Sequence, residues 1–369
     1  MDPLNMTVLL ECGSGDGRNA RVAHNSRRAL ATQHALFRRR IPFQSSLRRD
    51  YHAAKPRGNA LADSPHPDRH SASTLVATTP LVREWRANDG LRLAATTWPA
   101  KNAGSSPPQV LCLAGLSRNS RDFTPLAEAL AARGFDVTAM DYRGRGLSDH
   151  DADWRNYAIE REAEDIDCGL DGLGIPRAIV IGTSRGGLHA MLLALRSSDR
   201  VAGVVLNDIG PTIERHGLHR LAGTIGHTME AADWPSAAAR LRDALAEQFP
   251  GLDDAGWERF ARQLYVETPD GLHLDYDEKL RHTLADLDRE ADLPDFWPVF
   301  DAIRATPLLA LRGAHSDLLS EETFAEMMRR HPDAQALTVE DEGHAPLLWD
   351  AKTQDAIVNF ACRCAGKSD

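Results

Sequence analysis

Short apolar runs alternate with amphipathic segments from residue 79 to the end of the chain. The apolar runs cover residues 109–116, 135–142, 177–184, 201–208, 306–313 and 334–340, and helical periodicity appears near 122–133, 157–172, from 185, near 320–331 and near 351–364. Continuous apolar strands separated by helices are typical of a parallel sheet buried on both faces. Ahead of them, residues 82–87 and 91–98 flank an Asn88-Asp89-Gly90 turn, which predicts a β-hairpin. The pattern predicts an α/β fold with a mostly parallel, eight-stranded sheet flanked by helices.

This alternation is interrupted over residues 211 to about 303. The interruption is helix-like, contains several prolines and carries Trp234, Trp257 and Trp297. An insertion of this size between two strands of one sheet, here after the sixth strand, predicts a helical cap. We expect its tryptophans to shape an apolar substrate pocket.

Residues 1–78 differ in composition from the rest of the chain. They are rich in Arg, His, Ser, Ala and Pro without a sustained period, and residues 1–70 hold 12 Lys and Arg against 6 Asp and Glu. This composition predicts a disordered or weakly structured basic extension, although a start codon assigned too far upstream would give the same pattern. Residues 79–369 then form the folded domain.

Composition also limits the classes of partner and cofactor. The net charge is -10, and because residues 1–70 are basic the remainder is strongly acidic, which argues against nucleic acid as the main partner. No apolar run approaches the roughly 18 residues of a membrane span. Five scattered cysteines favour a reducing, cytoplasmic location and lack zinc spacing. We expect a small-molecule substrate, neither metal nor cofactor, and no membrane partner; the oligomeric state is not indicated.

The strongest local motif is Gly182-Thr183-Ser184-Arg185-Gly186-Gly187, which follows an apolar strand and precedes a helix. Small residues on both sides of a serine allow the tight strand-to-helix turn known as a nucleophile elbow, which exposes the hydroxyl above the sheet edge. The motif predicts Ser184 as a nucleophile.

A serine hydroxyl needs a base within hydrogen-bond reach and a third group that orients the base. His344 follows the last predicted strand and Asp317 follows the one before it, so both lie at strand ends, where an open α/β sheet places its site. The order Ser, acid, His is the one that this motif requires. Asp208, at the end of the preceding strand, is the alternative acid.

Acyl transfer also requires hydrogen-bond donors for the oxyanion. One should be the backbone N–H of Arg185, directly after the nucleophile. The other should come from the loop after residues 109–115, most simply the backbone N–H of Leu116.

Two further motifs carry a family resemblance. Residues 141–149, Asp-Tyr-Arg-Gly-Arg-Gly-Leu-Ser-Asp, are similar to the Asp-x-Arg-Gly-x-Gly-x-Ser turn of the α/β-hydrolase superfamily, and residues 207–211, Asn-Asp-Ile-Gly-Pro, to the start of its cap. With the elbow, residues 80–366 resemble its capped single-domain esterases, lactonases and carbon-carbon bond hydrolases. There are departures: Ala114-Gly115 replaces the His-Gly frequent in the oxyanion loop, and Arg185 stands where relatives often carry Met or another apolar residue.

The resemblance implies a serine hydrolase that cleaves a small carboxylic ester through an acyl-serine intermediate. A lactonase or a carbon-carbon bond hydrolase using the same triad is the alternative. A ligand receptor that keeps the fold without turnover is a third hypothesis.

Overall fold

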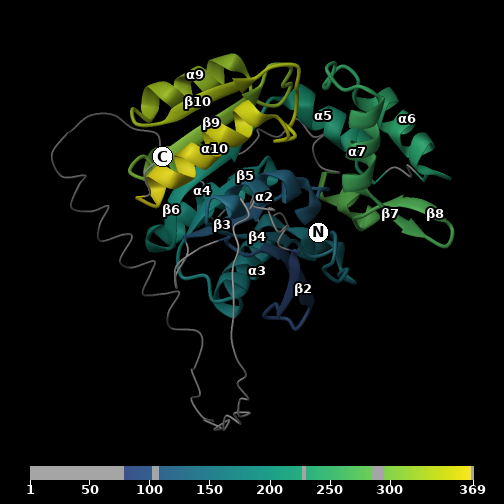
Figure 1. Ribbon diagram of the computed structural model, residues 1–369, viewed down its shortest axis with the longest axis horizontal. Helices are drawn as coiled ribbons and strands as arrows, with labels where there is room; N and C mark the ends of the chain where they lie inside the picture. The colour runs from purple at the N-terminus through teal and green to yellow at the C-terminus, as the bar shows by residue number, and fades with distance from the viewer. Residues whose placement is uncertain (1–78, 102–107, 227–229, 285–294, 367–369) are drawn as a thin grey trace, which may run out of the picture. The chain divides into compact units, whose positions relative to one another are not determined.

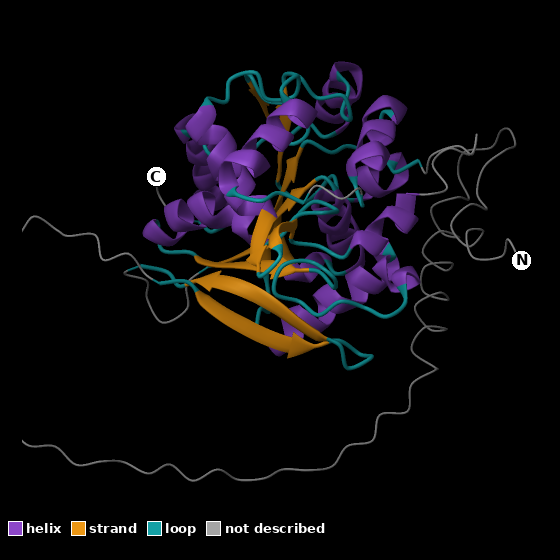
Figure 2. Ribbon diagram, turned by 90° about the vertical axis from the view of Figure 1, so that its right-hand side faces the viewer, coloured by secondary structure: helices purple, strands orange, loops and turns teal. Residues whose placement is uncertain are grey.

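A twisted sheet of eight strands runs through the domain, with helices on both of its faces (Figure 2). The computed structural model describes residues 79–101, 108–226, 230–284 and 295–366. The predicted basic extension, residues 1–78, lies outside the described residues.

The sheet has the predicted class and strand number. Its order is β1-β2-β4-β3-β5-β6-β9-β10; β1 and β2 form an antiparallel hairpin, β2 pairs antiparallel with β4, and all other pairs are parallel. The strands are β1 (Leu81–Arg86), β2 (Arg92–Trp98), β3 (Gln109–Leu113), β4 (Asp136–Asp141), β5 (Ala178–Thr183), β6 (Val201–Asn207), β9 (Leu308–Gly313) and β10 (Gln335–Val339). The prediction of a mostly parallel, eight-stranded sheet is confirmed.

Side chains alternate between the two faces of each strand, so each face packs its own core. On β3, Leu111 and Leu113 face the layer that contains helices α3 (Ile159–Gly172), α4 (Arg185–Arg196) and α9 (Glu321–Arg330). Val110 and Cys112 face the layer of α2 (Thr124–Ala132) and α10 (Ala351–Cys364). Because both faces are covered, the central strands are continuous apolar runs.

The segment between β6 and β9 forms a separate layer, visible as α5 to α7 and the β7–β8 hairpin in Figure 1. It contains α5 (Arg215–Thr224), α6 (Trp234–Leu245), α7 (Asp254–Leu264), β7 (Tyr265–Thr268), β8 (Gly271–Leu274), η5 (Glu278–Leu284) and α8 (Trp297–Ala302). We call this segment the cap. Helices α6 and α7 pack against each other around an apolar core of the cap's own.

The hairpin was not part of the predicted helical cap. β7 and β8 pair antiparallel, and the two residues between them are Pro269 and Asp270. Proline presets the backbone for a turn and Gly271 adopts a positive φ of 124°, so this sequence favours a tight turn over a continued helix.

Candidate active site

Ser184 lies in the sharp turn between β5 and α4. Its φ of 51° and ψ of -115° are unusual for a residue with a side chain, and its backbone N–H donates to the carbonyl oxygen of Asn207 on β6 (2.9 Å). The turn depends on Gly186, because a Cβ at that position would overlap the carbonyl oxygen of Leu113 on β3. The strained serine is therefore held by close packing of α4 against the sheet.

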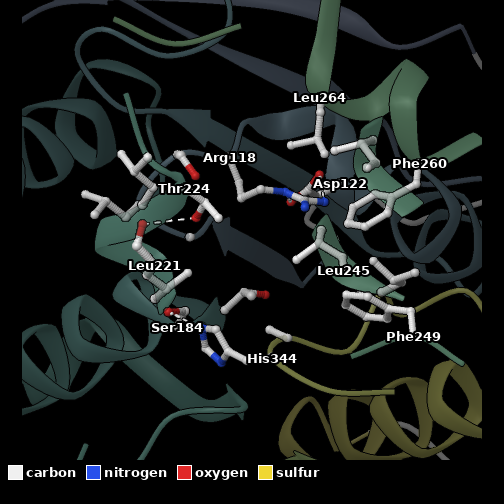
Figure 3. Close-up of a pocket in the computed structure, with 18 of the residues that line it drawn as sticks. Arg118, Asp122, Ser184, Leu221, Thr224, Leu245, Phe249, Phe260, Leu264 and His344 are labelled. Atoms are coloured by element: carbon white, nitrogen blue, oxygen red, sulfur yellow. Dashed lines mark hydrogen bonds and ion pairs between the residues drawn. The ribbon is translucent and has the colours of Figure 1, made fainter. Parts of the chain in front are cut away.

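His344, on the loop after β10, contacts Ser184. Its Nε2 lies 2.9 Å from the Oγ of Ser184, and the two side chains lie side by side in Figure 3. The backbone N–H of His344 donates to Oε1 of Gln248 in the cap (2.8 Å), and only 9% of the histidine is exposed. The backbone of His344 is thus held by the cap while its ring contacts the hydroxyl.

The other ring nitrogen of His344 contacts Asp208. Nδ1 lies 2.8 Å from Oδ2 of Asp208, which is fully buried directly after β6. The carboxylate also accepts the backbone N–H of Gly313 on Oδ1 (2.7 Å) and the hydroxyl of Ser316 on Oδ2 (2.6 Å). Three donors fix its orientation, so Asp208 is a rigid acceptor for the imidazole.

The predicted acid Asp317 does not occupy this position, and the structure corrects that assignment. Its carboxylate forms a bidentate ion pair with Arg220 of α5, with Nε–Oδ2 and Nη2–Oδ1 separations of 2.5 and 2.9 Å. Burial would raise the pKa of Asp317, but Arg220 and the nearby His344 outweigh burial and lower it. The sequence showed two carboxylates at adjacent strand ends, and it could not show that the cap supplies a cation to one of them.

The loop after β3 passes beside Ser184. A Cβ on Gly115 would lie 3.8 Å from the Cβ of Ser184, and Gly115, Leu116 and Ser184 line the same cavity. Arg185 is the first residue of α4, so its backbone N–H is among those left without an intrahelical acceptor. Both predicted oxyanion donors therefore belong to segments that adjoin Ser184.

The cavity above Ser184 has a volume of about 140 Å³ and lies between the sheet's strand ends and the cap. Figure 3 shows Ser184 and His344 at one side and Phe249 and Phe260 at another. Arg118 contributes a charged group, but Asp122 pairs with it bidentately at 2.7 and 2.8 Å. The remaining wall is mostly apolar and includes Phe123, Leu221, Ile225, Leu241, Leu245, Leu264, Leu274, Leu347 and Leu348.

The prediction that three tryptophans line this pocket is wrong for the described cavity, whose walls include none of them. Trp257 is 2% exposed and packs with Phe249 and Phe260 in the cap core. Trp234 lies under the guanidinium of an arginine on α7, and Trp297 donates from Nε1 to a threonine hydroxyl near the start of the cap. Trp257 and Trp234 thus belong to the core of the cap, whereas Trp297 packs against the core beneath the sheet.

Glu342 is a half-buried carboxyl on the loop that carries His344. Burial raises its pKa to about 7, even though the backbone N–H of Leu347 donates to it (2.7 Å) and opposes that change. The group therefore titrates near neutral pH, two residues from the imidazole.

The profile of the family described as alpha/beta hydrolase fold matches residues 108–351, about two thirds of the chain. The chain belongs to this family.

Individual relatives of this α/β-hydrolase are also hydrolases. A 3-hydroxybutyrate-oligomer hydrolase of Cupriavidus necator is 31% identical over 253 residues, which are 67% of this chain and 85% of the relative. An sn-1-specific diacylglycerol lipase of Mus musculus is 29% identical over 284 residues, covering 74% and 87% of the two chains. The crystal structure of an α/β-hydrolase from Novosphingobium aromaticivorans matches with a TM-score of 0.72 and 38% identity, over 77% of this chain and 98% of that one. The predictions that the chain is an α/β-hydrolase and that it is a hydrolytic enzyme are confirmed.

The described residues of this α/β-hydrolase contain neither a candidate membrane span nor a candidate metal-binding group. No helix there combines the length and apolar character of a membrane span. No group of three or more His, Cys, Asp or Glu side chains within the same residues is arranged to hold a metal ion.

Proposed function

We propose that this chain is a serine hydrolase that cleaves carboxylic esters, with Ser184 as nucleophile, His344 as general base and acid, and Asp208 as the group that orients the histidine. The observation that carries the proposal is the continuous contact from the Ser184 hydroxyl through both nitrogens of His344 to the Asp208 carboxylate, at 2.9 and 2.8 Å. The line ends in an apolar cavity, where an acyl group would lie beside the hydroxyl.

The first half of the reaction acylates the serine. With Nδ1–H donated to Asp208, the lone pair of Nε2 on His344 faces the Ser184 hydroxyl and removes its proton as Oγ attacks the ester carbonyl carbon. The carbonyl oxygen becomes an oxyanion, for which we assign the backbone N–H groups of Leu116 and Arg185 as donors. When the tetrahedral intermediate collapses, His344 returns the proton to the departing alcohol, and an acyl-Ser184 remains.

The second half hydrolyses the acyl-enzyme. His344 takes a proton from water, the hydroxide oxygen attacks the acyl carbon, and the same two N–H groups receive the second oxyanion. Collapse of this intermediate breaks the bond to Ser184, whose Oγ recovers the proton from His344. The carboxylic acid leaves and the enzyme is restored.

The cavity favours an apolar acyl or alcohol group of moderate length. Its aliphatic and aromatic walls would gain free energy from burying methylene groups, at about 0.8 kcal/mol each. Two relatives support the ester class, because hydroxybutyrate oligomers and diacylglycerols, named in their descriptions, are both carboxylic esters. We therefore expect simple aliphatic esters to be substrates.

A chain-length series of p-nitrophenyl esters tests the proposal. Hydrolysis should be measurable with the full-length protein, and Ser184→Ala should reduce kcat by at least about 10⁴-fold. A fluorophosphonate probe should label the protein and fail to label the Ser184→Ala variant. Turnover that survives the substitution would refute the proposed nucleophile.

Lactones and vinylogous diketones, assayed in parallel, separate the ester hydrolase from the related activities. If a lactone or a diketone exceeds every simple ester in kcat/KM and still requires Ser184, the triad is correct and the ester assignment is wrong.

A further inference from the structure

The loop that should supply one oxyanion donor is anchored at three successive carbonyl groups. Ala114 accepts from the hydroxyl of Tyr142 (3.2 Å), Gly115 accepts from the backbone N–H of Arg118 (3.2 Å), and Leu116 accepts from Nε of Arg145 (2.8 Å). In a planar trans peptide the carbonyl and the next N–H point in opposite directions. The Leu116 N–H shares its peptide group with the Gly115 carbonyl, so the bond from Arg118 fixes its direction, while Arg145 holds the carbonyl of the next peptide group, directly after Leu116. Two of the three anchors come from residues 141–149.

The residue that should supply the other donor is anchored through its side chain. Nε of Arg185 lies 2.5 Å from Oε2 of Glu162, and Nη2 donates to the backbone carbonyl of Tyr157 (2.9 Å). This holds the first turn of α4, where the backbone N–H of Arg185 begins the helix. The arginine that differs from the apolar residue of many relatives thus has a structural partner.

Glu162 joins these two anchors. Its Oε1 lies 2.8 Å from Nη1 of Arg145, while Oε2 contacts Arg185 and lies 3.0 Å from Nε2 of His189. Glu162 and Arg145 are both fully buried. Burial alone would raise the pKa of Glu162, but the charges of Arg185 and Arg145 outweigh burial and hold this pKa well below its usual range. The carboxyl group is therefore ionised. A charged carboxylate on α3 thus bridges two arginines, one of which holds the loop after β3 and the other the first turn of α4.

We propose that Glu162 is a positioning residue of the oxyanion hole: through Arg145 it holds the Leu116 carbonyl, and with it the loop that carries the Leu116 N–H, and through the side chain of Arg185 it holds the first turn of α4. The inference rests on the proposed function, since it assumes that these two groups bind the oxyanion. It also accounts for the Ala114-Gly115 loop, which Tyr142 and Arg145 anchor in place of a histidine within the loop.

Replacing Glu162 with glutamine changes charge with little change in volume. The amide keeps one oxygen acceptor, but its N–H₂ group faces one of the two guanidinium groups, so that arginine loses its carboxylate partner and must shift. The local charge becomes more positive. If Glu162 acted only through the local potential, this change would stabilise an oxyanion more strongly, whereas displaced donors would stabilise it less. The sign of the effect therefore separates positioning from charge.

The test compares turnover, substrate binding and transition-state affinity in Glu162→Gln. Removing one oxyanion donor costs about 10²- to 10³-fold in kcat, so displacing donors should cost about 10- to 100-fold. We expect that loss in kcat for a p-nitrophenyl ester, with KM changed by less than about threefold. Affinity for a trifluoromethyl ketone, which adds to the serine as a tetrahedral oxyanion, should fall by the same factor as kcat.

Asp165→Asn is the matched control. Asp165 lies on the same helix and pairs bidentately with the buried Arg143, at 2.7 Å for both contacts, without touching Leu116 or Arg185. Its loss also leaves a buried arginine short of a partner, so both variants should lose thermal stability. Only Glu162→Gln should lose the kcat and the ketone affinity.

Arg185→Met keeps the test decisive if Glu162→Gln does not fold, because methionine is compatible with a helix and Glu162 keeps Arg145 as an ion-pair partner. This variant should lower kcat by about 3- to 10-fold. Where both variants fold, the double variant should lose less than the product of the single losses, because both act through one contact.

Outcomes for the inference and for the proposed function are distinct. If Ser184→Ala retains full turnover, the proposed function fails. If turnover requires Ser184 while Glu162→Gln and Arg185→Met both keep kcat and ketone affinity within about twofold of the wild type, the positioning role is refuted. The same conclusion follows if Asp165→Asn loses as much kcat as Glu162→Gln.

Discussion

Replacing Asp208 with asparagine tests the corrected assignment of the acid with little disturbance of the backbone. Asp208 has a φ of 55°, a left-handed conformation that asparagine adopts more readily than most residues. The amide oxygen can still accept the N–H of Gly313. The amide nitrogen must then face Nδ1 of His344, where the carboxylate oxygen stood.

This exchange reverses the direction of one hydrogen bond. An amide N–H donates, so Nδ1 of His344 becomes the acceptor and the ring proton moves to Nε2. A protonated Nε2 cannot take the proton of the Ser184 hydroxyl, which lies 2.9 Å away. Loss of the correct tautomer costs about 10⁴-fold in kcat in serine hydrolases, which corresponds to about 5.4 kcal/mol of transition-state stabilisation.

The assay is steady-state hydrolysis of a p-nitrophenyl ester by Asp208→Asn and Asp317→Asn side by side. Asp317→Asn weakens the ion pair with Arg220 of the cap and leaves the Asp208–His344 contact in place. We expect the kcat of Asp317→Asn to fall by less than about tenfold. Because the cap borders the cavity, the KM of this variant can change by more than its kcat. Melting temperatures of both variants show whether either is unfolded.

The reverse order of effects would refute this reasoning. If Asp317→Asn lost about 10³-fold or more in kcat while Asp208→Asn kept more than a tenth of the wild-type kcat, the histidine would be oriented by Asp317 during turnover.

Three further predictions follow from the packing and the charges. Burial raises the pKa of Glu342 to about 7 from an ordinary 4.5, so the folded state holds the proton between these values and stability falls as pH rises through them. Urea unfolding of Glu342→Gln should therefore show a gain of about 2 kcal/mol over the wild type at pH 8 that is absent at pH 4; an equal difference at both pH values would contradict the titration. Gly186→Ala should lose at least about 3 kcal/mol of stability or fail to fold, because the new Cβ overlaps the carbonyl of Leu113; an unchanged melting temperature would exclude that overlap. Leu245→Trp fills part of the cavity and should shift the kcat/KM ratio of octanoate to butanoate esters at least about 10-fold toward butanoate, whereas Trp297→Phe should leave the ratio unchanged.

The fold could be predicted because its signals are local. Each central strand is an apolar run bounded by turn residues, and the elbow serine has small neighbours that the tight turn requires. Ser184 and His344 could be proposed for the site for the same reason, since Ser184 directly follows β5 and His344 lies on the loop after β10. The β7–β8 hairpin also had a local signal, the Pro-Asp-Gly turn, which an otherwise helical context obscured.

The parts that could not be predicted depend on contacts between distant segments. Asp208 and Asp317 both follow strands, and only the position of Arg220, about 97 residues before Asp317, distinguishes a structural carboxylate from one that faces the histidine. The cap tryptophans failed as pocket residues because composition cannot show which face of a helix meets the cavity and which meets the cap's own core. The partner of Arg185 could not be predicted either, because Glu162 lies on α3 and Arg185 on α4.

The clamp on Asp208 has a consequence for how such an enzyme diversifies. The carboxylate lies just before the cap begins, yet Gly313 and Ser316, which hold it, come after the cap has ended. The two chain ends between which the cap is inserted are thus joined by hydrogen bonds that the cap does not supply. A cap of another length or shape could therefore be inserted between these two ends without breaking the hydrogen bonds of Gly313 and Ser316 to Asp208, although the contact of Gln248 with His344 would have to be replaced.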